Sequence, residues 1–203
     1  MSLSVSSIPN LLGLLRIIAT PLLFWLIVLG QPAAYLWATV LFLLMALSDI
    51  ADGKIARHLN VVSPLGIFLD TISDKIFVTG ALIPMVQNGM LPGWAVFAII
   101  TREFIISGLR SFAAAEGVVI PAGKLGKQKL VITVVALTWR MLAANAERGG
   151  FLADTLDGAL IPLLNLWPLA IALAVAWTVT SGIEYLWRAW PLLQQSWAPR
   201  TTE

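Results

Sequence analysis

Four aspartates lie close together in an otherwise apolar part of the sequence. Asp49 and Asp52 are three residues apart, and Asp70 and Asp74 are four residues apart. On α-helices, residues at these spacings lie on one face. Only a short turn separates the two segments, so the two acidic faces can meet. The spacing therefore predicts four carboxylates converging on one small volume.

Such an acidic cluster is unfavourable without a counterion. Two like charges about 4 Å apart repel by roughly 4 kcal/mol at an effective dielectric near 20. The cluster must be protonated, paired with cations or filled with metal. All-oxygen ligands select hard cations such as Mg²⁺ or Mn²⁺, and two such ions can clamp a transferring phosphoryl group. Mg²⁺ or Mn²⁺ is therefore the natural filling for this cluster, with protonation or pairing with basic residues as the alternatives.

Small residues share the faces of these acids. Gly53 and Ala56 continue the first acidic face, and Gly66 lies one turn before Asp70. A nucleotide or diphosphate could approach the backbone there. The alternative is that the small residues only allow the helices to pack closely. Three of them interleaved with four acids favour a ligand.

The composition indicates the elements that must position these residues. Of 203 residues, 59% are hydrophobic and 12% charged, a more apolar balance than soluble domains have. A spanning helix needs about 20 mostly apolar residues. We predict an all-α integral membrane protein, one domain over residues 1–203, with six transmembrane helices. Their expected ranges are 8–29, 32–57, 64–86, 92–116, 125–144 and a last segment from 161 or 167 to 187.

The basic residues predict the orientation of these helices. With the N-terminus in the cytoplasm, the inner side receives most of the lysines and arginines, and the outer side receives Arg148 and Arg140. This asymmetry follows the positive-inside rule. The expected location is a bacterial cytoplasmic membrane, with the aspartates at its cytoplasmic face. The formal net charge of +2 gives no reason to expect nucleic acid as a partner.

The acidic segment also resembles a known family. The pattern D-x2-D-G-x2-A-R-x8-G-x3-D-x3-D is met in full and resembles the signature of the CDP-alcohol phosphotransferase family. The resemblance implies six transmembrane helices, a cytoplasm-facing cavity, two divalent metals, a homodimer and transfer of a phosphoryl group from a CDP-linked donor to an alcohol. It implies metal binding by the four aspartates, with Asp74 as general base. It places the CDP moiety at Asp52, Gly53, Ala56, Arg57 and Gly66.

Two further segments narrow the acceptor. Residues 8–24 and 101–129 resemble the branch of the family that transfers a phosphatidyl group from CDP-diacylglycerol to glycerol 3-phosphate. Glu103, Ser107 and Arg110 share a helix face inside an apolar span, where ionisable residues are functional candidates. We predict an acceptor-phosphate site formed by Arg110, Lys127, Arg16 and Lys124. The lysines could instead contact anionic lipid headgroups.

Two other functions remain open from the sequence. Within the family, the acceptor could be phosphatidylglycerol or inositol phosphate. In a different class, membrane carboxylates mark the ion paths of transporters. A transporter would place its acids near the bilayer midplane, often between inverted repeats, whereas these acids are expected at one membrane face and no repeat is visible.

Overall fold

Helices account for nearly all of the described chain. The structure, a computed structural model, describes residues 8–58, 64–121, 123–156 and 160–197, leaving out the side chains of 8, 9, 52–58, 64, 67, 124 and 127. These residues form eight helices and no strand. The prediction of an all-α protein is confirmed. The helices are α1 (Ile8–Val28), α2 (Pro32–His58), α3 (Pro64–Gln87), α4 (Gly93–Ala115), α5 (Lys124–Glu147), α6 (Phe151–Thr155), α7 (Leu160–Leu164) and α8 (Trp167–Ser196).

Four of the long helices end in the same way. Gly30, Gly89, Gly117 and Gly149 follow the last residues of α1, α3, α4 and α5, and each has φ between 66° and 71°. This left-handed conformation is accessible to glycine at little cost and closes a helix C-terminus. After α3, for example, the Met90 amide donates to the Met85 carbonyl at 2.8 Å. The glycine-rich breaks in the sequence are therefore helix ends.

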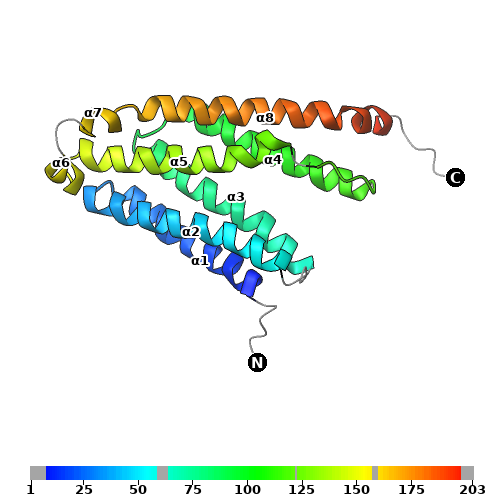
Figure 1. Cartoon of the computed structure of the whole chain (residues 1–203), viewed down its shortest axis with the longest axis horizontal. Helices are drawn as coiled ribbons and strands as arrows, with labels where there is room; N and C mark the ends of the chain where they lie inside the picture. The colour runs from blue at the N-terminus through cyan, green and yellow to red at the C-terminus, as the bar shows by residue number, and fades with distance from the viewer. Residues whose placement is uncertain (1–7, 59–63, 122, 157–159, 198–203) are drawn as a thin grey trace.

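The long helices pack side by side in two groups. Figure 1 shows α1, α2 and α3 inclined to the layer that contains α4, α5 and α8. The close pairs include α1 with α3 and α2, α5 with α8 and α2, and α4 with α8. One apolar core joins both groups through residues such as Phe42, Phe77 and Leu137, with the Phe42 and Phe77 ring centroids 4.8 Å apart. The groups diverge toward the end where α1 begins and α8 finishes (Figure 1).

The opposite end, near α6 and α7, is tied together by polar contacts. The buried Arg140 donates to the Met90 carbonyl at 2.9 Å, pairs with Glu147 at 3.0 Å and lies over the Trp167 ring. Asn145 donates to the Pro32 carbonyl at 2.8 Å. These bonds join α2, α5 and α8 and hold this end closed. The two groups of helices are therefore held together at this end and diverge at the other (Figure 1).

The apolar helices make this chain a membrane protein. Four stretches of the described residues are long and apolar enough to cross a membrane, at 10–28, 32–51, 128–147 and 160–196. The helices α3 and α4 are of similar length, 24 and 23 residues. Each carries three charged residues, Asp70, Asp74 and Lys75 in α3 and Arg102, Glu103 and Arg110 in α4. These six charged residues are the reason why α3 and α4 are not among these four apolar stretches.

Candidate active site

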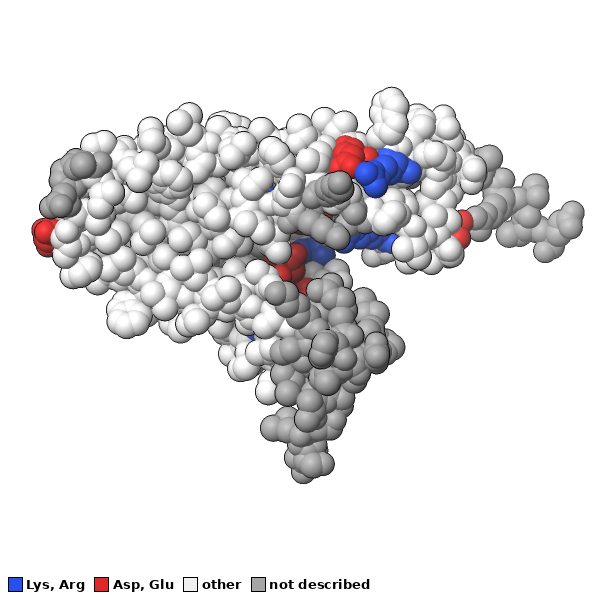
Figure 2. Space-filling view, in the orientation of Figure 1, with Lys and Arg blue, Asp and Glu red and all other residues white. Residues whose placement is uncertain are grey.

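A cavity of about 470 Å³ lies between the two groups of helices. Its walls come from Asp49 of α2, the polar part of α3, one face of α4 and the first turns of α5. Figure 2 shows acidic and basic side chains gathered where the two groups of helices separate, while most of this face is uncharged. A concave site with convergent polar groups is the usual form of a ligand site. The cavity is therefore the candidate active site.

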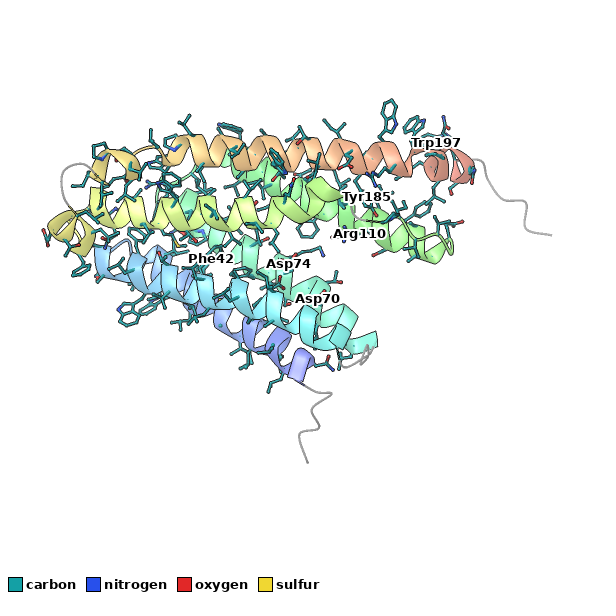
Figure 3. The ribbon with its side chains drawn as sticks, viewed as in Figure 1. Phe42, Asp70, Asp74, Arg110, Tyr185 and Trp197 are labelled. Carbon is teal, nitrogen blue, oxygen red and sulfur yellow. The ribbon has the colours of Figure 1, made fainter. Side chains whose placement is uncertain are left out.

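Three of the four predicted aspartates line this cavity. They are Asp49 from α2 and Asp70 and Asp74 from α3. Figure 3 shows Asp70 and Asp74 along one side of α3, with Arg110 of α4 across from them. The Oδ1 atom of Asp74 is buried and has no hydrogen-bond partner among the described residues. A buried carboxylate oxygen without a partner is costly, so this atom is suited to bind something that enters the cavity.

Arg16 lies beneath the acids. It is 1% exposed, and its Nη1 atom lies 2.6 Å from Asp49 Oδ1 and donates to Ser73 Oγ at 2.9 Å. These contacts link α1, α2 and α3 at the floor of the acidic wall. Arg16 was expected at the acceptor phosphate, and it is not among the residues that line the cavity. Its described contacts, with Asp49 and Ser73, place its guanidinium against the wall that carries the aspartates.

The wall opposite the aspartates carries a network of charged and polar residues. Glu103 of α4 accepts hydrogen bonds from Arg102, at 3.2 Å, and from Lys129 of α5. Arg102 also donates to Ser181 Oγ of α8 at 3.1 Å. The network joins α4, α5 and α8, and both Arg102 and Lys129 donate to the same oxygen of Glu103, Oε1. The network ties α8 to α4 and α5, the two helices that face the acids.

Arg110 stands nearer the open end of the same wall. The predicted face of α4 is confirmed, because Glu103, Ser107 and Arg110 all line the cavity. The Arg110 guanidinium lies 5.4 Å from the centre of the Tyr185 ring of α8. A planar guanidinium held against an aromatic ring keeps its donors free for a phosphate or carboxylate. Arg110 is thus placed to bind an anion in the cavity.

The contribution of α8 was not predicted from the sequence. Arg102 and Arg110 also border a small hollow with Ser181, Glu184, Tyr185 and Arg188 of α8. Glu184 accepts from Arg188 at 2.6 Å. The signal was available, because Ser181, Glu184 and Arg188 recur at spacings of three and four in an apolar helix and so mark one polar face. The sequence reasoning assigned no site residue to this helix.

Several predicted residues lie outside the side chains that the structure describes. They are Asp52, Gly53, Ala56 and Arg57 of α2 and Lys124 and Lys127 of α5. Gly66 is described and lies in the first turn of α3, one turn before Asp70. Among the described residues, no three acidic or histidine side chains are grouped closely enough to hold one metal ion. Asp49, Asp70 and Asp74 therefore share one cavity but do not by themselves form a metal-binding group.

Fold and site together define a helical membrane protein with a polar cavity at one end. Acids on one wall can bind cations or accept a proton, and cations on the other wall can bind phosphate. These features suit a reaction between a membrane-bound phosphate compound and a polar partner.

Comparisons with known proteins identify the family. The family described as CDP-alcohol phosphatidyltransferase matches residues 6–181. A Bacillus subtilis (strain 168) protein is 36% identical over 205 residues, covering 94% of this chain and 98% of that protein. Proteins of Pseudomonas fluorescens, 32% identical over 93% of this chain and 92% of theirs, and Rickettsia bellii (strain RML369-C), 31% over 88% and 93%, are also similar. All three are named CDP-diacylglycerol–glycerol-3-phosphate 3-phosphatidyltransferase. The chain belongs to the CDP-alcohol phosphatidyltransferase family, as its acidic motif predicted, and this is a family of transferases.

Proposed function

We propose that this enzyme transfers the phosphatidyl group of CDP-diacylglycerol to glycerol 3-phosphate, giving phosphatidylglycerophosphate and CMP. The observation that carries the proposal is one cavity with Asp49, Asp70 and Asp74 on one wall and Arg110 and Lys129 on the other. Both substrates are anionic, and one must lose a proton as it reacts. The names of the three relatives support the same donor and acceptor.

The proposal includes a specific arrangement in the membrane. All six long helices, α1 to α5 and α8, cross the bilayer, and residues 1–203 form one functional domain. The cavity faces the cytoplasm of a bacterial cell. Supporting this, Lys75, Arg110 and Lys129 lie at the cavity, whereas Arg140 and Arg148 contact Met90 and Gly30 near the turns at the closed end. Such an excess of basic residues marks the cytoplasmic side.

The donor chemistry of the aspartates suits divalent cations. The donor set consists of carboxylate oxygens, which Mg²⁺ and Mn²⁺ prefer, and Asp74 Oδ1 is a buried oxygen that lacks a partner among the described residues. We propose that Asp49, Asp52, Asp70 and Asp74 hold two such ions. When bound, they would neutralise the donor diphosphate and the departing CMP. Arg16 would then hold Asp49 in position from the side away from the cavity.

The protein's own residues supply the remaining steps. Asp74 accepts the proton of the C1 hydroxyl of glycerol 3-phosphate as that oxygen attacks the phosphorus bonded to diacylglycerol. The bond from this phosphorus to the CMP oxygen breaks, and CMP leaves with the electron pair. Arg110, with Lys124 and Lys127, binds the acceptor phosphate and so orients the hydroxyl. The CDP moiety is bound by Asp52, Gly53, Ala56, Arg57 and Gly66. Catalysis is chiefly positioning and charge stabilisation.

An acceptor panel tests this function. Purified protein, CDP-diacylglycerol and Mg²⁺ would be offered glycerol 3-phosphate, inositol phosphate, phosphatidylglycerol and serine in turn, and CMP release would be measured. Glycerol 3-phosphate should be the preferred acceptor. Preference for inositol phosphate or phosphatidylglycerol would keep the family chemistry and replace the acceptor. If no acceptor releases CMP, the proposed reaction is wrong, and ion flux in liposomes would test the transporter alternative.

A further inference from the structure

An apolar groove of about 610 Å³ runs along α1 and α3. On α3 it is lined by a stripe that includes Ile76, Thr79 and Ile83, and Phe104 of α4 forms part of its wall. Both α1 and α3 carry the groove away from the end that holds the aspartates. The volume falls within the range of about 300–1,000 Å³ that is usual for ligand sites. The groove is therefore large enough to bind a molecule.

Lys75 connects this groove to the candidate active site. It lines both the polar cavity and the apolar groove. Its ammonium group donates to the Thr71 carbonyl at 2.8 Å, and Thr71 itself lines the cavity. The next residue, Ile76, already belongs to the groove. A molecule with an anionic head and an apolar tail could lie across Lys75 with each part in matching surroundings.

We propose that the groove binds an acyl chain of CDP-diacylglycerol, with the Lys75 ammonium beside the phosphate that carries diacylglycerol. This inference rests on the proposed function, because it takes the donor from it. Lys75 connects the groove to the cavity that holds the aspartates. This connection favours the donor as the occupant, because bulk lipid or a second copy of the chain would not need to reach the aspartates. An acyl chain is already in an apolar medium in the bilayer, so the groove adds little affinity. Its contribution is to orient the phosphorus for attack.

The groove can be tested by filling it far from the chemistry. Ile83 lies eight residues after Lys75, about 12 Å along the helix, and is 47% exposed. Ile83→Trp should lower kcat/KM for dioleoyl CDP-diacylglycerol by about tenfold or more, because a displaced chain misplaces the reacting phosphorus. A dihexanoyl donor, whose chains end before Ile83, should be turned over at the parental rate. Leu22→Trp is the matched control, because Leu22 is 50% exposed on α1 and does not line the groove.

Crosslinking provides a second measurement that does not need a variant. The parent protein would be irradiated with CDP-diacylglycerol that carries a diazirine at the end of an acyl chain. Crosslinks at the groove residues of α1 and α3 are expected. Crosslinks spread over the exposed face of α8 would overturn the proposal, as would equal loss of activity with both donors or no loss with either. The proposed function is tested separately, by CMP release from the parent protein.

Discussion

Asp70 and Asp74 are one turn apart on α3 but differ in their surroundings. Asp70 is exposed, whereas Asp74 Oδ1 is buried without a partner among the described residues. A general base must reach the hydroxyl from which it takes the proton. The amide of Asp74→Asn keeps the size of the side chain and cannot accept that proton. CMP release should therefore fall by about a hundredfold or more.

Donor binding distinguishes this role from simple misfolding. The Asp74→Asn variant should still bind CDP-diacylglycerol while failing to release CMP. Near-parental turnover would assign the base to another group.

Asp70 tests the proposed cations. Asp70→Asn should lower activity by about a hundredfold even at saturating Mg²⁺, since it removes a key electrostatic group. In the parent protein, EDTA should abolish CMP release and added Mg²⁺ or Mn²⁺ should restore it. Full activity of the parent in EDTA would rule out the two-cation site.

Arg110 tests recognition of the acceptor phosphate. A hydrogen bond to a charged group is worth roughly 1.5–3 kcal/mol, so Arg110→Ala should raise the KM for glycerol 3-phosphate about tenfold or more. The KM for CDP-diacylglycerol should change little. Arg148→Ala is the matched control, because its guanidinium also lies over a tyrosine, 5.2 Å from the centre of the Tyr35 ring, outside the cavity. A rise confined to the donor KM would place Arg110 at the CDP moiety instead.

At the scale of the helices, the sequence predicted most of the fold. The long helices begin and end close to the expected residues because glycine and proline mark their ends locally. The exceptions lie near the C-terminus. Helix α8 continues to Ser196 through Pro191, nine residues past its expected end. The short helix α6 lies between the expected fifth and sixth spans, and α7 occupies the start of the last segment if that segment begins at 161. These features depend on packing against other helices, which local patterns do not encode.

The same limit applies to the site. Spacing along one helix predicted the shared face of Glu103, Ser107 and Arg110. It could not predict that Glu103 pairs with Lys129, or that Arg16 pairs with Asp49, because those contacts depend on how separate helices are rotated and spaced. The aspartates could be predicted from a single segment of the sequence. The opposite wall could not, because it forms only when α4 packs against α5 and α8.

Close packing of α1 against α3 depends on Gly80. A Cβ atom at this position would lie 2.2 Å from Thr20 Cγ2, and Thr20 is held by its bond to the Arg16 carbonyl at 2.8 Å. Gly80→Ala should therefore lower the melting temperature, although alanine favours helix formation. Thr20→Ser removes the clashing methyl group and should restore part of the loss.

Gly108 of α4 provides the control for this test. A Cβ there would meet nothing within 4 Å, so Gly108→Ala should leave stability unchanged or raise it. If Gly80→Ala is equally harmless in thermal unfolding, the close contact between α1 and α3 is wrong.

The whole molecule has a charged open end and a closed end that the proposal places on opposite sides of the membrane. The chain contains no cysteine, so a single introduced cysteine reports its own location. Asp154 lies in α6 at the closed end, and Gln195 lies in the last turn of α8 at the open end. Along the chain, α8 is the one long helix between Asp154 and Gln195. If α8 crosses the membrane once, the two residues lie on opposite sides.

The two positions therefore test the direction of insertion directly. In intact cells, a membrane-impermeant maleimide should label Asp154→Cys and should label Gln195→Cys only after the membrane is opened. The reverse pattern would place the cavity outside the cytoplasm, away from a soluble phosphorylated acceptor. Labelling of both in intact cells would mean that α8 does not span, and the six-helix arrangement would fail. Both residues lie outside the cavity, so CMP release by each variant can verify that the labelled protein is folded.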